Sequence, residues 1–209
     1  MDRQGACQRP TAESSHGHWC PVDVDEANMM PELPNTALSD AAHGLDTSRQ
    51  LSSIPRTEQG EKWTYPSAMQ FYNALMLKRK TTPDEAAYMR DAVMAHNAVN
   101  ERTWDKVLEW ERMHASTCAN PQLRRFVGRY GKESPRSFLH RFIWGMGKPF
   151  DRHDWFVNRC GHDVRYIIDY YDDPKAGDDV QVYIDARPAL DSLGALYDRI
   201  RRSFKRQQP

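Results

Sequence analysis

Residues 154–172, which read DWFVNRCGHDVRYIIDYYD, decide the fold class of this chain. The ranges Asp154–Cys160 and Val164–Asp172 are rich in Val, Ile, Tyr and Phe, and Gly161-His162 separates them. This pattern predicts two antiparallel strands joined by a tight turn. A third range of the same kind, Val180–Asp185, follows after a loop of Asp, Pro and Gly. The three ranges predict a small antiparallel meander.

Helical patterns lie on both sides of the meander. Ser67 with Gln70 forms a capping box that predicts a helix to about Lys78, and Thr82 with Glu85 forms a second box. The second helix is predicted from Pro83 to about His114, with a break or kink at Asn97 and Asn100 left open, because Asn is a poor helix former. Further helices are predicted over Pro135–Trp144 and from Pro188, the latter with apolar residues at three- and four-residue spacing: Leu190, Leu193, Leu196, Tyr197, Ile200 and Phe204. The predicted class is α+β, a small antiparallel sheet packed against several helices.

The first third of the chain differs in composition from the rest. Residues 1–62 hold one of the 22 aromatic residues, Trp19, and carry five basic and ten acidic residues. Such a segment buries too little apolar surface to offset its ordering entropy, which predicts disorder. We therefore predict a mostly disordered tail over residues 1–62, which contains a Cys-Pro-Val motif, and one folded domain over residues 63–209.

Composition also excludes several classes of function. Lys+Arg and Asp+Glu both number 29 in the 209 residues, so no net charge attracts the chain to nucleic acid, and no nucleic-acid partner is expected. The sequence has no apolar run long enough to span a membrane and no pattern of a cleaved secretory signal, which indicates a soluble chain. Phosphate-binding glycine loops and nucleophile elbows are also missing from the sequence.

The four cysteines, Cys7, Cys20, Cys118 and Cys160, lie far apart and none forms a Cys-x-x-Cys pair. This spacing does not favour a zinc site or a disulfide framework, and reduced thiols are the preferred interpretation. Cys20 begins the motif Cys20-Pro21-Val22. Cys-Pro is a short motif by which several regulatory proteins bind haem iron through a thiolate.

Three other residues are candidates for chemistry. His96 lies inside the second predicted helix, where a lone histidine is more often a surface or hydrogen-bonded residue than a ligand. His153 precedes Asp154, but neighbours on a strand point to opposite faces, which argues against a catalytic dyad. Arg159 shares a strand face with two apolar residues including a tryptophan, and such a face fits a flat anionic ligand. An ion pair between Arg159 and a carboxylate is an equally good interpretation.

Taken together, these residues resemble the holocytochrome c synthases, or cytochrome c haem lyases. The matching blocks run in order over roughly residues 20 to 204. They are Cys20-Pro21-Val22, Ser52–Arg56, Lys62–Ser67 with Gln70–Ala74, His96-Asn97 with Asn100-Glu101, Trp104, Leu108–Glu111, Pro149–Gly161, Val164–Asp172 and Asp185–Leu193.

The resemblance implies an enzyme of the mitochondrial intermembrane space, peripheral on the inner membrane. Such an enzyme attaches haem b to apocytochrome c through thioether bonds between the Cys-x-x-Cys-His thiols and the two haem vinyl groups. Matching the family motifs to this sequence implies that His96 is the axial ligand of the haem iron and that Trp63 lies against the haem. The same match implies that Glu101 and Arg159 are needed for full activity. His153 is a family residue of less certain role, and Cys20 is a further possible haem ligand with a regulatory role.

Two rival classes of function stay open at this point. A haem-binding sensor or carrier would need the ligand and a haem site, but it would not turn over an apocytochrome. A structural membrane-associated protein would bind neither haem nor apocytochrome. The sequence does not decide which c-type cytochromes are substrates.

Overall fold

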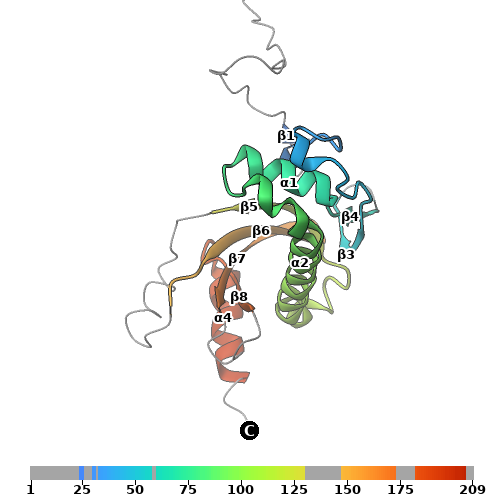
Figure 1. Ribbon diagram of the computed structural model, residues 1–209. Helices are drawn as coiled ribbons and strands as arrows, with labels where there is room; N and C mark the ends of the chain where they lie inside the picture. Colours follow the sequence, from blue (N-terminus) through green and yellow to red (C-terminus); the bar gives the residue numbers. More distant parts are fainter. Residues whose placement is uncertain are drawn as a thin grey trace, which may run out of the picture.

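The computed structural model describes residues 24–25, 30–31, 33–57, 60–129, 147–172 and 182–205. Its centre is a four-stranded antiparallel sheet with the strand order β5-β6-β7-β8 (Figure 1). The strands are β5 (Gln122–Gly128), β6 (Asp151–Arg159), β7 (His162–Asp172) and β8 (Val182–Pro188). Helices pack against this sheet, so the predicted α+β class is confirmed.

The predicted hairpin is present as β6 and β7. Arg159 pairs with His162, so the turn consists of Cys160 and Gly161, whose φ angles are 46° and 99°. Positive φ at both central residues is what the twist of a two-residue hairpin requires, and glycine adopts it without a steric penalty. The side chain of Asn158 accepts a hydrogen bond from the amide of Gly161 at 2.7 Å. The strand β5 was not predicted, because two arginines at its centre interrupt the apolar pattern.

The predicted helices are largely confirmed. α1 (Ala68–Leu77) begins with its capping box: Ser67 Oγ accepts from the Gln70 amide at 3.1 Å, and the Gln70 side chain accepts from the Ser67 amide at 3.2 Å. The second helix begins as the 3₁₀ helix η2 (Pro83–Tyr88), continues as α2 (Met89–Glu111) and ends as η3 (Arg112–His114). The predicted helix over residues 135–144 lies outside the described residues.

α2 runs without a break through Asn97 and Asn100. Both side chains are buried and hydrogen-bonded: Asn97 donates to the Gln50 side chain at 2.9 Å, and Asn100 donates to the carbonyl of His96 at 2.8 Å. The tertiary bond of Asn97 and the local bond of Asn100 to its own helix thereby offset the low helix propensity of asparagine.

The N-terminal third contributes two strand pairs and a short helix. β1 (Val24–Asp25) pairs with β2 (Met30–Pro31), and β3 (Leu51–Pro55) pairs with β4 (Lys62–Thr64). The 3₁₀ helix η1 spans Asp40–Ala42. Residues 33–57 fold against the rest of the chain, contrary to the disorder that composition predicted for residues 1–62, because Ala42 and Ile54 are buried in its hydrophobic clusters. The division into a tail and a lyase domain stays a prediction.

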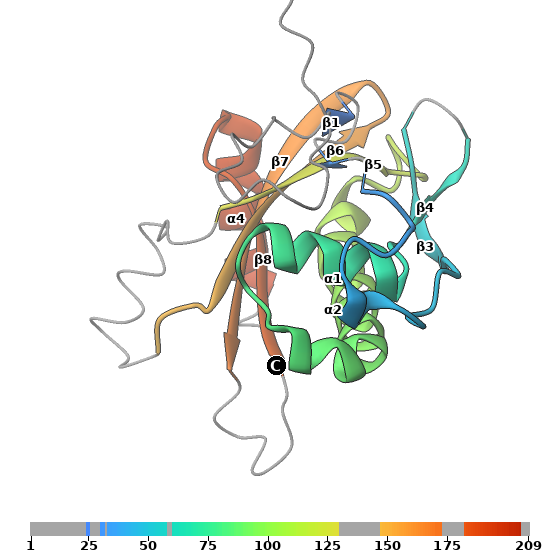
Figure 2. The ribbon, with the colours of Figure 1, turned by 45° about the horizontal axis from the view of Figure 1, so that its top comes forward.

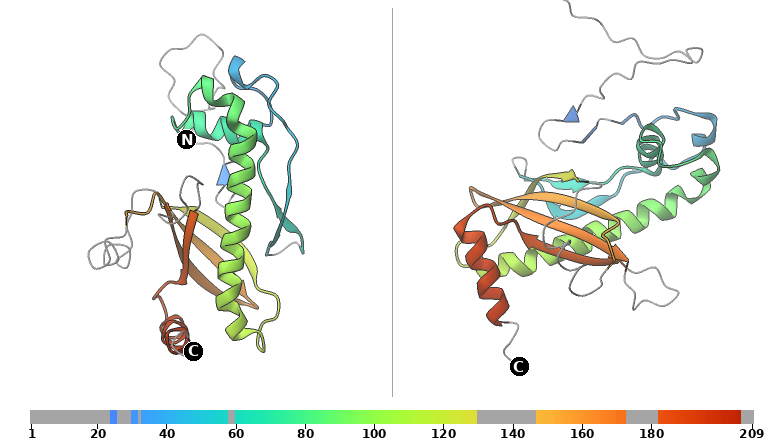
Figure 3. Two further views of the ribbon diagram at one scale, coloured as in Figure 1. Left: turned by 60° about the horizontal axis from the view of Figure 1, so that its bottom comes forward. Right: turned by 90° about the vertical axis from the view of Figure 1, so that its left-hand side faces the viewer.

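Two hydrophobic clusters share α2. The larger one fills the space between α2 and the sheet, with Trp104, Val107 and Trp110 from the helix. The smaller one joins the N-terminal end of α2, through Met89 and Val93, to α1. Figure 2 shows α1 beside α2, and Figure 3 shows α2 running along the sheet, with α1 at one end of the molecule and α4 at the other.

The other face of the sheet carries buried ion pairs. Arg187, which is fully buried, binds Asp169 at 2.5 Å, and Asp154 accepts from Arg165 at 3.1 Å. Buried charges need such partners because low polarity makes an isolated charge unfavourable.

The last helix, α4 (Leu193–Lys205), begins five residues later than the predicted start at Pro188, since Pro188 is the end of β8. Its orientation is also unexpected, because its large apolar residues are exposed and Asp198 is buried. Among the described residues, no helix is both long and apolar enough to cross a membrane.

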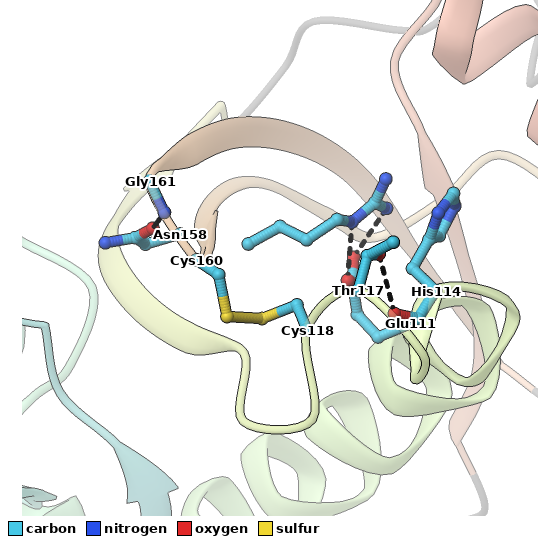
Figure 4. Close-up of a disulfide and its surroundings, with 8 residues drawn as sticks. Glu111, His114, Thr117, Cys118, Asn158, Cys160 and Gly161 are labelled. Carbon is cyan, nitrogen blue, oxygen red and sulfur yellow. Dashed lines mark hydrogen bonds and ion pairs between the residues drawn. A yellow bond between two sulfur atoms is a disulfide. The ribbon is translucent and has the colours of Figure 1, made fainter.

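A disulfide joins Cys118, after η3, to Cys160 in the hairpin turn, with the Cα atoms 5.6 Å apart (Figure 4). The preference for reduced thiols was therefore wrong for these two residues. They are separated by 42 residues, and only the packing of α2 along β6 brings them together. Cys7 and Cys20 lie outside the described residues.

Reducing this disulfide should destabilise the protein. Closing a loop of this size restricts the unfolded chain, so we expect Cys118→Ser to lower the free energy of unfolding by about 2–4 kcal/mol. The measurement is thermal unfolding of the wild type and Cys118→Ser, each with and without reductant, and only the wild type should respond to reductant. Rapid alkylation of both thiols in the folded, unreduced protein would contradict the bond.

Candidate functional site

His96 lies on α2 between the two hydrophobic clusters, and aromatic side chains surround its ring. The Phe71 ring of α1 lies 5.2 Å from the His96 ring, and the Tyr65 ring lies edge-on at 6.3 Å. Residue 65 directly follows β4, and residue 71 lies in the first turns of α1. The β3–β4 pair and α1 thus each place one aromatic side chain beside the ring of His96.

The polar neighbours of His96 come from its own helix. Asn97 Oδ1 lies 3.3 Å from Nδ1, and the Asn100 amide nitrogen lies 3.2 Å from Nε2. Burial lowers the pKa of His96, and the nearby His153 lowers it further, whereas the hydrogen bond with Asn97 and the charge of Asp151 oppose this shift. At neutral pH the imidazole is therefore uncharged, which is the form that binds a metal.

His153 faces the same region from β6, close enough for its charge to affect the pKa of His96. Its ring packs beside Phe126 and Tyr170, with centroid distances of 6.4 and 5.4 Å. Its Nε2 lies 3.2 Å from Asp151 Oδ2, and its buried Nδ1 has no hydrogen-bond partner among the residues that the structure describes. Although burial acts in the opposite direction, the hydrogen bond with His153 lowers the pKa of Asp151.

The partner of His153 is Asp151 and not the adjacent Asp154. Residues two apart on a strand share a face, whereas neighbours do not. Asp154 points to the opposite face of the sheet and binds Arg129 and Arg165. The argument against a His153–Asp154 dyad is therefore confirmed.

Glu101 ties α2 to the β3–β4 pair. One carboxylate oxygen accepts hydrogen bonds from the Ser53 amide and from the Tyr65 hydroxyl, both at 2.9 Å, and the other accepts from the Ser53 hydroxyl. Burial, followed by the hydrogen bond to Glu101, raises the pKa of Tyr65, so this phenol stays protonated and donates. Glu101 thus holds Tyr65 edge-on against His96, as a positioning residue.

Trp63 lies in the larger cluster rather than on an open surface. Its indole nitrogen donates to the Leu123 carbonyl at 3.1 Å, and Phe126 packs edge-on at 5.7 Å. Phe126 also contacts the ring of His153. Trp63 is therefore connected to the histidine pair through one intervening aromatic ring.

Arg159 lies at the far end of β6 from His153. This separation of six residues corresponds to about 20 Å at the usual rise per residue of an antiparallel strand. It donates two hydrogen bonds to Glu111, at 2.7 and 2.8 Å, and lies 3.6 Å from Asp198. Although burial opposes its charge, the bond with Glu111 raises the pKa of Arg159. The structure therefore brings Trp63, His96, Glu101 and His153 into one region and places Arg159 in an ion pair elsewhere. Cys20 lies outside the described residues.

Sequence reasoning did not single out Phe71, Tyr65 or Asp151 as site residues. The aromatic pair is invisible to periodicity, because the two residues come from different elements and meet only through the fold. Asp151 could have been predicted as the partner of His153, since it stands two residues earlier on the same strand and shares its face.

The region can offer one histidine nitrogen as a ligand to a single metal atom, with aromatic rings beside it. Among the described residues, no three His, Cys, Asp or Glu side chains gather to hold a metal ion by themselves. One neutral imidazole flanked by aromatic rings instead suits a metal that brings its own macrocycle, as haem does.

Replacing Arg159 should affect the fold first. Arg159→Ala leaves the Glu111 carboxylate buried without its cation, which we expect to lower the free energy of unfolding by about 3–5 kcal/mol. The exposed pair Arg124–Asp163 provides a control, because Arg124→Ala should change the free energy of unfolding by less than about 1 kcal/mol. Thermal unfolding without haem is the measurement. An unchanged midpoint for Arg159→Ala combined with reduced haem binding would instead place this arginine at the haem.

Comparisons with known proteins identify the family of the chain. The family model "Cytochrome c/c1 heme lyase" matches residues 3–203. A "Holocytochrome c-type synthase" of Homo sapiens is 43% identical, with 86% of this chain aligned to 68% of that protein. A "Putative holocytochrome-c1 synthase" of Schizosaccharomyces pombe is 42% identical (87% of this chain, 80% of that protein), and the "Holocytochrome-c synthase" of Saccharomyces cerevisiae is 34% identical (90% and 80%).

The chain spans about two thirds of the length of the vertebrate relatives that it matches. No solved structure matches it. The family match covers nearly the whole chain, and the relatives share more than a third of its residues. The chain therefore belongs to the cytochrome c/c1 haem lyase family of enzymes.

Proposed function

We propose that this protein is a holocytochrome c synthase that joins haem b to apocytochrome c by thioether bonds. The observation that carries the proposal is His96: a neutral imidazole, largely buried between Phe71 and Tyr65, in a chain of the haem lyase family. Relatives named for both cytochrome c and cytochrome c1 match the chain, so either protein fits as the acceptor.

In this proposal haem is the substrate, and its iron binds His96 from one side. The histidine of the apocytochrome Cys-x-x-Cys-His segment binds the iron from the other side. Its two thiols then lie beside the two vinyl groups. Holding the reacting groups together in this way contributes roughly 7–11 kcal/mol in well-oriented reactions.

Each thioether forms by addition of a thiol to a vinyl group, without net oxidation or reduction. The thiol sulfur bonds to one vinyl carbon, and the thiol proton ends on the other vinyl carbon. No leaving group or oxidant is needed. The contribution of this chain is therefore to bind and orient the haem, with Glu101 and Tyr65 fixing the position of the His96 ring.

The other proposed site residues act around the ligand. Trp63 and Phe126 form the apolar wall between the large cluster and His153. His153, with its unpartnered buried Nδ1, faces the same region as His96 and serves as a second polar contact for haem. Cys20 stays a proposed regulatory haem ligand, and Arg159 is proposed to act by supporting α2. We also propose the intermembrane space of mitochondria as the location, with peripheral contact to the inner membrane.

Thioether formation distinguishes a synthase from a haem carrier. We expect co-expression with apocytochrome c to give a cytochrome whose haem stays attached under denaturing conditions. The matched control is the apocytochrome with both motif cysteines replaced by serine, which should retain no haem after denaturation. Haem that copurifies with this protein but never becomes covalent on the cysteine-containing acceptor would favour the carrier.

Loss of the proposed iron ligand should be partly repaired by free imidazole. His96→Gly removes the ring and leaves a cavity that neighbouring side chains fill only in part. We expect this variant to copurify with little haem and to mature little cytochrome, and imidazole added to the medium should restore some of both. His153→Gly is the control and should not respond to imidazole. Normal haem binding by His96→Gly without imidazole would show that another residue is the ligand.

A further inference from the structure

The helix α4 exposes its apolar face to solvent. Leu193 is 85% exposed, Tyr197 60% and Phe204 69%, and Leu196 and Ile200 are also exposed. At 100° per residue these five side chains lie within one third of the helix circumference. Leu190, which precedes the helix, is exposed as well. A soluble helix usually turns such a face to the core, so this orientation needs a cause.

The polar face of α4 is held inward by ion pairs. Asp198, only 2% exposed, lies 2.9 Å from His114 and 3.6 Å from Arg159. Arg202 binds Glu109 at 2.6 Å and stacks over the Trp110 ring at 4.2 Å. Rotating the helix to bury its leucines would expose the apolar ring of Trp110 and leave Asp198 without its partners. The outward orientation of the apolar face is therefore fixed by the C-terminal end of α2.

Positive charge accompanies this apolar face. Within Leu193–Lys205 there is one acidic residue, the buried Asp198, and there are four basic ones: Arg199, Arg201, Arg202 and Lys205. Of these, Arg202 belongs to the inward face, where it is paired with Glu109. On the helical wheel Arg201 borders the apolar face on one side. Arg199 lies beyond that face on the other side, where its guanidinium donates to the Pro188 carbonyl at 2.8 Å. A long basic side chain at the border of an apolar face, such as Arg201, is suited to extend toward phosphate groups while the apolar residues insert.

α4 lies at the end of the molecule opposite α1, at the periphery of the fold (Figures 1 and 3). We propose that α4 is the membrane-binding element of this protein, and that it lies in the interfacial layer of a bilayer rich in anionic lipids. An apolar face with a basic border, in which Tyr197 and Phe204 supply aromatic rings, is typical of helices that lie in the plane of the interface. A protein partner would require a complementary groove, whereas a bilayer accommodates the whole convex face at once.

This inference deepens the proposed peripheral membrane location and assigns it to one helix. The test is flotation of the full-length protein with vesicles of phosphatidylcholine alone or of phosphatidylcholine mixed with phosphatidylglycerol. We expect binding to the mixed vesicles, weakened by salt because the charges are screened at the surface. Tyr197→Glu combined with Ile200→Glu should weaken it by about tenfold or more, because two inserted side chains become charged. Arg201→Glu should weaken only the phosphatidylglycerol-dependent part.

The matched control places the same charges on other exposed apolar residues. Tyr88→Glu combined with Met94→Glu changes residues that are 68% and 61% exposed near the opposite end of the molecule, and it should leave vesicle binding unchanged. Unaltered unfolding midpoints show that both double variants are folded. Equal vesicle binding by the α4 variant and the wild type would overturn the proposal. So would vesicle-free self-association that the α4 substitutions abolish. Covalent haem attachment is measured separately without vesicles, so failure of the synthase assignment is distinguishable from failure of this one.

Discussion

The carboxylate of Glu111 is buried at the C-terminal end of α2, and the position of the long helix depends on how this charge is compensated. Arg159 donates two hydrogen bonds to it, and the Tyr166 hydroxyl donates a third at 2.5 Å. Burial, followed by the charge of Glu111, raises the pKa of Tyr166, so this phenol remains a donor. A buried carboxylate without such partners would destabilise the fold, and the pairing with Arg159 therefore favours the observed register of α2 along β6.

Once this end of the helix is fixed, geometry determines the other end. The fifteen residues from His96 to Glu111 span about 22 Å along the helix, and the six residues from His153 to Arg159 span about 20 Å along β6. The two elements run in the same direction, so His96 and His153 lie close enough for the charge of one to affect the pKa of the other. Glu101 then attaches the β3–β4 pair to the helix and places Tyr65 at the ring of His96. The C-terminal end of α2, where Glu111 lies, is followed by the disulfide cysteine Cys118. Residues at this end also bind the inward face of α4.

Local sequence patterns predicted what local physics determines. The two capping boxes, the β6–β7 hairpin and the class of the fold follow from residues close in the chain, although the turn lies at Cys160-Gly161 and not at the predicted Gly161-His162. Three features could not be predicted from periodicity. The apolar stripe of α4 indicates an amphipathic helix but not which face is covered, and the Cys118–Cys160 bond and the partner of Arg159 depend on contacts between distant elements. Family motifs predicted His96 as the iron ligand, which stays a proposal, and its aromatic surroundings come from elements that only the fold brings together.

The most direct test of this account is an experimental structure of the protein with haem bound. It predicts iron bound to an imidazole nitrogen of His96, with Phe71 and Tyr65 beside that ring, and Arg159 still paired with Glu111. Iron bound by His153 or by a cysteine thiolate, with His96 turned away from the porphyrin, would contradict it.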